Sequence, residues 1–230
     1  MSRILYKFAS RSRPDKFFAA VDNIYLNSRN KNFLILATLD DVDTTMNNTL
    51  VRDRMVHYDK LIPIFGTSKN KIEAYNRDLT SGWVFDILIN MSDDMVFIKD
   101  GYDIEIERDI MEAFPYMDGL IHYNDGNQGE NVITLAIMGK RYYDFFGYIY
   151  HPSYQSLWCD CDQMEVARRL KKYKYMGDEK IIFRHMHPSF GRGEMDELYA
   201  RNEDRTLWDI DERNYRERMA RNFDLTPIPA

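Results

Sequence analysis

The chain has few cysteines, no long apolar run and no basic stretch, and each absence excludes a class of protein. Its two cysteines, Cys159 and Cys161, are separated by a single residue. Residues at positions i and i+2 are poorly placed for a disulfide, and two cysteines alone do not make a structural zinc site. We therefore expect both cysteines to be reduced, partly buried packing residues.

The sequence also has no apolar run whose length is close to the about 20 consecutive residues of a membrane-spanning helix. Lys7, followed by Ser10 and Arg11, interrupts the N-terminal region where a signal peptide would have its apolar core. We therefore expect a cytoplasmic protein with no integral membrane segment. The formal net charge is −6 and no Lys/Arg stripe is present, which argues against a nucleic-acid partner.

What is present is the composition of an ordinary globular protein, with 230 residues of which 44% are hydrophobic and 30% charged. In the first half, apolar runs alternate with stretches of helical periodicity. We expect strands at 4–9, 33–39, 61–65 and 85–90, with helices at 14–25, 44–58 and 70–79 between them. This alternation predicts parallel βαβ units and a doubly wound, mostly parallel α/β sheet.

The second half is less regular. We expect helices at 104–114, 140–146 and 160–172 and strands at 119–123, 132–138 and 180–183. From Glu194 onward the chain is charged and helical with few apolar anchors. We therefore predict a domain over residues 1–190 and a C-terminal helical appendage over 191–230.

The fourth predicted strand runs directly into Ser92-Asp93-Asp94. Open α/β sheets bind ligands at the carboxyl ends of their strands. Two adjacent carboxylates repel each other and are costly to desolvate, so the pair makes most sense beside a cation. A hard divalent ion that holds a substrate phosphate fits this need. The alternative is a solvated acidic turn.

Two further polar clusters follow predicted strands. Ser10-Arg11-Ser12-Arg13 comes after the first strand, and Asp40-Asp41 after the second. An arginine offers a planar donor fork for phosphate or base, and an aspartate can accept hydrogen bonds from a nucleobase or ribose. The alternatives are a solvated basic turn and a helix-capping aspartate.

Histidines and a helix start complete the set of candidates. His185 and His187 follow the last predicted strand, and we expect one of them to reach the site while the other packs or is solvated. Asp160 and Asp162 begin the helix at 160–172. Capping explains at least one of them, while a helix N-terminus also keeps an aspartate ionised, as a general base requires.

The order of these parts resembles the GT-A-fold glycosyltransferases, in particular the family-2-like group, over roughly residues 3–190. Ser92-Asp93-Asp94 at a strand end and Trp158-Cys159-Asp160-Cys161-Asp162 at a helix start carry the resemblance most strongly. It implies a Rossmann-like GT-A sheet and a metal-dependent, inverting, hexosyltransferase-type glycosyltransferase. Its partners would be a UDP- or GDP-linked sugar donor and the hydroxyl of a glycan or other acceptor.

On the donor side, the resemblance implies that Asp41 or Asp40 contacts the nucleobase and that Arg11 or Arg13 lies beside the nucleotide. The chain has Ser-Arg-Ser-Arg and no glycine after its first strand. Sugar nucleotidyltransferases, which share a similar sheet, usually have a Gly-rich phosphate loop there. That alternative is therefore disfavoured.

The resemblance further implies that Asp94 and Asp93 hold Mn²⁺ or Mg²⁺ against the diphosphate and that His187 or His185 completes the metal site. Asp160 would deprotonate the acceptor. The motif reads Ser-Asp-Asp where the family has Asp-x-Asp, which leaves the ligating carboxylate open. A catalytically inert carbohydrate- or protein-binding module on the same fold is the remaining alternative.

Overall fold

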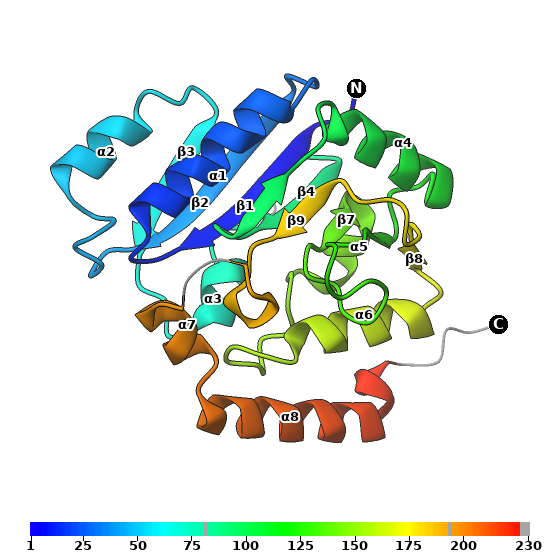
Figure 1. Ribbon diagram of the computed structural model, residues 1–230. Coiled ribbons are helices and arrows are strands. Elements are labelled where there is room, and N and C mark those ends of the chain that lie inside the picture. The colour runs from blue at the N-terminus through cyan, green and yellow to red at the C-terminus, as the bar shows by residue number, and fades with distance from the viewer. Residues whose placement is uncertain (81, 193–194, 226–230) are drawn as a thin grey trace.

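A mixed β-sheet lies at the centre of the protein, with helices on both of its faces (Figure 1). The computed structural model describes residues 1–80, 82–192 and 195–225. Within them the sheet has seven strands in the order β3-β2-β1-β4-β7-β6-β8. The strands are β1 (Ile4–Ser10), β2 (Phe33–Asp40), β3 (Leu61–Gly66), β4 (Ile87–Met91), β6 (Leu120–His122), β7 (Ile137–Gly139) and β8 (Tyr173–Tyr175).

The first four strands in this order are parallel, whereas β7 is antiparallel to both β4 and β6. A separate antiparallel pair joins β5 (Met95–Phe97) to β9 (Phe183–His185). The α-helices are α1 (Pro14–Asn27), α2 (Thr49–Met55), α3 (Lys71–Asn76), α4 (Tyr102–Ala113), α5 (Lys140–Phe146), α6 (Cys159–Arg169), α7 (Glu197–Asn202) and α8 (Arg205–Ala220). Two 3₁₀ turns, Pro188–Phe190 and Asn222–Asp224, complete the described elements.

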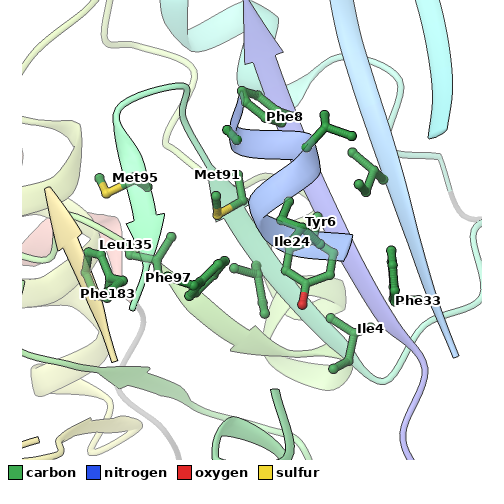
Figure 2. Packing of buried hydrophobic residues seen from close by; sticks show 14 of the residues in the cluster. Ile4, Tyr6, Phe8, Ile24, Phe33, Met91, Met95, Phe97, Leu135 and Phe183 are labelled. Atoms are coloured by element: carbon green, nitrogen blue, oxygen red, sulfur yellow. The ribbon is translucent and has the colours of Figure 1, made fainter. Parts of the chain in front are cut away.

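Alternate residues of each central strand enter two different hydrophobic cores. On one face, Tyr6 and Phe8 of β1 belong to the same hydrophobic cluster as residues of α1 and as Met91, Phe97 and Phe183 (Figure 2). On the other face, neighbouring strand residues pack with α3, α5 and α6. Burial on both faces explains why these strands have nearly continuous apolar sequences.

The predicted fold class, a doubly wound and mostly parallel α/β sheet, is confirmed. Pro14 begins α1 as expected, and Asn70 caps α3 by accepting a hydrogen bond from the backbone N–H of Glu73. The helix predicted over 44–58 is wrong in its first turn. Asp43 holds that segment in a turn by accepting the backbone N–H of Thr45, and the helix starts only at residue 49.

Two further differences concern short strands. The last strand lies at Phe183–His185 and not at 180–183, because pairing with β5 extends it through polar residues. The strand predicted over 132–138 is confined to Ile137–Gly139, and β8 was not predicted at all. Glu194, where the charged C-terminal segment was expected to begin, lies outside the described residues.

Candidate functional site

The carboxyl ends of β1, β2 and β4 meet at one edge of the sheet. The register pairs Ser10 with Leu39 and Phe8 with Met91, so the polar segments after these strands are adjacent. They border a cavity of about 220 Å³. The predicted site residues that line it are Arg11, Arg13, Asp40, Asp93, Asp94, Asp160, His185 and His187.

Asp94 lies at the centre of this group and is buried. Its carboxylate accepts hydrogen bonds from the hydroxyls of Ser92 and of Tyr199, the latter at 2.9 Å, and its Oδ2 lies 3.3 Å from Nε2 of His185. Burial alone would raise the pKa of Asp94, but these contacts, led by that with His185, hold the pKa well below its usual range. Asp94 is therefore an anion at neutral pH.

His185 reaches Asp94 because β9 pairs with β5, which places His185 opposite Met95. The other ring nitrogen, Nδ1, faces Oδ2 of the buried Asp125 at 3.6 Å. Burial alone would lower the pKa of His185, but the carboxylates of Asp125 and Asp94 outweigh it and raise the pKa to about 9. A cation, here the imidazolium, thus sits between two buried carboxylates.

Asp125 is held in place by its own loop. Its Oδ1 accepts the backbone N–H groups of Asn127 and Gln128, each at 2.7 Å. Burial would raise the pKa of Asp125, but the contact with His185 and these N–H groups lower it to about 2. No sequence signal distinguished this aspartate from others in polar loops.

The donor set of Asp94 and His185 fits a divalent cation, which would displace the proton that the His185 ring carries at neutral pH. Ligands of one Mg²⁺ or Mn²⁺ lie about 3 Å apart when the bonds are about 2.1 Å long. Asp94 Oδ2 and His185 Nε2 meet this condition at 3.3 Å, with Asp125 behind the ring where a histidine ligand usually has a carboxylate partner. Within the described residues, no group of three or more His, Cys, Asp or Glu side chains could hold a metal by itself.

Asp93 has different partners. Its carboxylate accepts hydrogen bonds from Ser10 Oγ at 3.0 Å and from Arg13 at 3.1 Å. Burial raises the pKa of Asp93, and Arg13 only partly offsets this. Arg13 also pairs with Asp196, and its guanidinium lies 3.9 Å from the ring centre of Tyr199. Asp93 and Arg13 thus brace the edge of the sheet against the start of α7.

Asp40, the last residue of β2, and Asp41, which follows it, differ in position. Asp40 lines the cavity and forms an ion pair with Arg11. Asp41 is exposed, and its carboxylate accepts a long hydrogen bond from Thr67 at 3.3 Å. Of the two aspartates predicted to contact a nucleobase, Asp40 therefore has the better placement.

Asp160 and Asp162 both lie in the first turn of α6, but their carboxylates have different environments. Asp162 is buried and accepts hydrogen bonds from Tyr154 at 2.8 Å and from Arg218 at 2.7 Å, which is a structural role. Asp160 lines the cavity, and its Oδ1 accepts the backbone N–H of Cys161. Neither aspartate is the cap, because the helix begins after Trp158 without a side-chain cap. Asp160 is the carboxylate that can meet a ligand.

His187 also lines the cavity, so the expectation that only one of the two histidines reaches the site is wrong. The backbone is extended at both His185 and His187, and residues two positions apart in an extended chain lie on the same face, so the two rings are neighbours with centres 5.1 Å apart. His187 Nε2 lies 2.8 Å from Glu203 Oε1. Burial and the neighbouring His185 cation lower the pKa of His187.

The C-terminal segment contributes contacts that sequence reasoning missed. Around α7, Asp196 pairs with Arg13, Tyr199 donates to Asp94, and Glu203 pairs with His187. These three residues had no distinguishing pattern in the sequence. The segment predicted to be an appendage thus forms one wall of the site.

No protein-family model matches the chain, and no curated protein sequence matches it. Solved structures do match. A mannosyltransferase from Pyrobaculum calidifontis, PcManGT, solved in complex with GDP-Man and Mn²⁺, aligns with a TM-score of 0.62 and 10% identity over 95% of this chain and 75% of that one. S. aureus TarS, residues 1–349, aligns with a TM-score of 0.59 and 9% identity over 98% of this chain and 75% of that one.

The same TarS fragment in complex with UDP gives a TM-score of 0.58 and 10% identity over 97% of this chain and 72% of that one. The expected resemblance to GT-A-type glycosyltransferases is confirmed at the level of the fold, and it extends over most of the chain. None of the helices in the described part of the chain combines the length and apolar content that crossing a bilayer requires.

Proposed function

We propose that this protein is a metal-dependent, inverting glycosyltransferase that moves a sugar from a nucleoside-diphosphate donor to an acceptor hydroxyl. The observation that carries the proposal is the ionised Asp94 beside His185, at the carboxyl edge of the sheet and in the same cavity as Asp160. The complexes of two structural neighbours, with GDP-Man and with UDP, support a donor of this class.

On the donor side, Asp40 and its partner Arg11 are placed to recognise the nucleotide. A carboxylate accepts hydrogen bonds from base or ribose, and a guanidinium donates a planar fork to phosphate. The ion pair with Arg11 also offsets the negative charge of Asp40, which would otherwise repel the diphosphate. Asp41, being exposed, is the weaker candidate for base recognition.

Asp94 and His185 would hold Mn²⁺ or Mg²⁺, with Asp93 and His187 as further candidate ligands. When bound, such an ion neutralises the charge that develops on the leaving diphosphate. Asp93 is less suited to this role than Asp94 because Arg13 and Ser10 occupy its oxygens. Asp125 orients the His185 ring so that Nε2 faces Asp94.

On the acceptor side, Asp160 is the proposed general base. The attacking hydroxyl must lose its proton as it bonds to the anomeric carbon, and a carboxylate within hydrogen-bond reach can take it. Direct attack in a single displacement inverts the anomeric configuration. Asp160 accepts the backbone N–H of Cys161 and forms no ion pair within the described part of the chain, so its carboxylate can accept the proton of an acceptor hydroxyl.

A donor screen with the Asp160→Asn variant tests the proposal. With UDP- and GDP-linked hexoses and Mn²⁺, the wild type should transfer or hydrolyse one donor, and the variant should lose about 10²–10⁴-fold in kcat. Its affinity for the nucleoside diphosphate should be unchanged. Glu165→Gln, in the same helix with a surface partner in Arg169, is the matched control and should retain full activity.

The same screen separates the enzyme from the inert binding module that the fold also permits. Turnover that survives Asp160→Asn would exclude Asp160 as the base. A wild type that binds a nucleoside diphosphate but turns over no donor would favour the binding module instead.

A further inference from the structure

Helix α8 carries a buried carboxylate that accepts hydrogen bonds from three consecutive backbone N–H groups. Asp211 is 0% exposed. Its Oδ1 accepts the N–H of Gln155 at 3.0 Å, and its Oδ2 accepts those of Ser156 and Leu157, each at 2.8 Å. A carboxylate with several N–H donors is a strong, charge-assisted anchor for a loop.

The anchored loop leads directly into the first turn of α6. Ser156 and Leu157 line the cavity, and Asp160 follows Leu157 by three residues. Between them, Trp158 has a left-handed backbone, with φ of 61°, which a non-glycine residue adopts only when its surroundings enforce it. Because α6 has no side-chain cap, the loop itself determines where the helix starts.

The C-terminal segment contacts this loop at further points. The Trp158 ring packs against Trp208 and Tyr215 of α8, with ring centres 5.4 and 5.3 Å apart. Ser156 Oγ donates a hydrogen bond to the carbonyl oxygen of Asn202, 2.7 Å away at the end of α7. Figure 1 shows α8 running beside α6 at the lower edge of the molecule.

We propose that Asp211 is a positioning residue for the acceptor side of the site. By fixing the loop at 155–157, it sets the position of the first turn of α6 and thereby of Asp160 relative to the acceptor hydroxyl. The inference rests on the proposed function, in which Asp160 is the base. Within the described residues Asp211 is not part of the cavity wall, so it acts through the loop and not by contact with substrate.

The test compares Asp211→Asn with Asp209→Asn, a surface residue of the same helix that pairs with Arg205. An asparagine amide would place an N–H₂ against backbone N–H groups that need an acceptor. We expect Asp211→Asn to lower kcat for transfer by about 100-fold, because small misplacements of a catalytic group have effects of this size. The Kd for the nucleoside diphosphate with Mn²⁺ should stay within about 2-fold of the wild type.

Amide hydrogen exchange provides a readout that does not depend on activity. In Asp211→Asn the amides of residues 155–157 should exchange faster, while those of β1 and β4 should keep their wild-type protection. Asp209→Asn should match the wild type in every measurement.

Two results would overturn the inference. In one, Asp211→Asn leaves kcat unchanged. In the other, the variant weakens nucleotide binding as much as it slows transfer, which would indicate a general structural role. A wild type without any transfer activity is a separate outcome, since it would refute the proposed function itself.

Discussion

Arg13 illustrates how one residue type can serve two purposes that the sequence does not separate. In the sequence it is one of two arginines that could lie beside a nucleotide. In the structure its side chain is only 8% exposed and joins Asp93, Asp196 and the ring of Tyr199. It stabilises the edge of the sheet on which the site is built.

We predict that Arg13→Gln lowers the free energy of unfolding by about 3 kcal/mol, because it leaves the buried Asp93 carboxylate without its cation. Lys16→Gln is the matched control. Lys16 also pairs with Asp196, but its side chain is 40% exposed against 8% for Arg13, so its loss should cost less than about 1 kcal/mol. Denaturant unfolding of both variants measures the difference, and equal costs would contradict the assignment.

At His185, two carboxylates raise the pKa of the ring to about 9. Asp125→Asn removes one of these charges, so the pKa of His185 should fall toward its ordinary value. An NMR titration of the metal-free protein measures this, with Asp178→Asn, in the neighbouring loop, as the control. If the pKa of His185 is unchanged in Asp125→Asn, then Asp125 does not act on the ring as described.

Candidate site residues could be predicted where they lie at the end of a long strand or in the turn after it. Asp94 and Asp40 were found in this way, because parallel strands deliver their carboxyl ends to one edge. Asp125, Tyr199 and Glu203 could not be found, since each reaches the site through tertiary contacts of a loop or a short helix. Nothing in the local sequence distinguishes them from ordinary polar and aromatic residues.

At the scale of elements, the strands of five or more residues were predicted, whereas among the three-residue strands β6 was predicted at 119–123, β7 and β9 only overlap their predicted ranges, and β5 and β8 were not predicted. β1, β2 and β4 have apolar sequences long enough to indicate burial on both faces. β5, β8 and β9 have three residues each, and their pairing partners determine them more than their composition does. The position of His185 opposite Met95 therefore had to come from the structure.

The β6–β8 pair contains a buried histidine that should make stability depend on pH. His122 lies between Tyr173 and Tyr175, and burial lowers its pKa to about 4. Between pH 6.5 and 4 the unfolded chain binds a proton that the folded protein does not. Folding stability should therefore fall over this range as the pH decreases, by up to about 3 kcal/mol.

Denaturant unfolding at pH 7 and pH 4.5 tests this, with His122→Gln compared with His57→Gln at an exposed position. His122→Gln should lose part of the pH dependence, and His57→Gln should keep all of it. If the free energy of unfolding falls by the same amount between pH 7 and pH 4.5 in the wild type and in His122→Gln, His122 is not the group responsible.

At the scale of the whole molecule, the C-terminal helices are joined to the rest of the protein by buried polar contacts. Arg218 of α8 pairs with Asp162 of α6, and both side chains are buried. The predicted division into 1–190 and 191–230 stays a prediction, but contacts of this kind indicate that the two parts stabilise each other.

A chain that ends at residue 203 would test this dependence. It lacks Arg218, which leaves the buried Asp162 carboxylate without its cation, and it exposes Trp158. We expect its free energy of unfolding to fall by at least about 3 kcal/mol relative to the full chain. If the truncated chain unfolds at the same denaturant concentration as the full chain, residues 1–203 form an independent domain.

The central claim is that the edge of the sheet around Asp94 binds a nucleoside diphosphate together with a divalent cation. Calorimetric titration of the purified protein with UDP and with GDP, in Mn²⁺ and then in EDTA, tests it most directly. Asp94→Asn is the test variant, and Asp86→Asn is the control. Asp86 immediately precedes the first residue of β4, at the other end of the strand from Asp94, and forms a surface ion pair with Arg3.

We predict that one of the two nucleotides binds in Mn²⁺, that EDTA abolishes the binding, and that Asp94→Asn loses it while Asp86→Asn does not. Binding of neither nucleotide under any of these conditions would contradict the account.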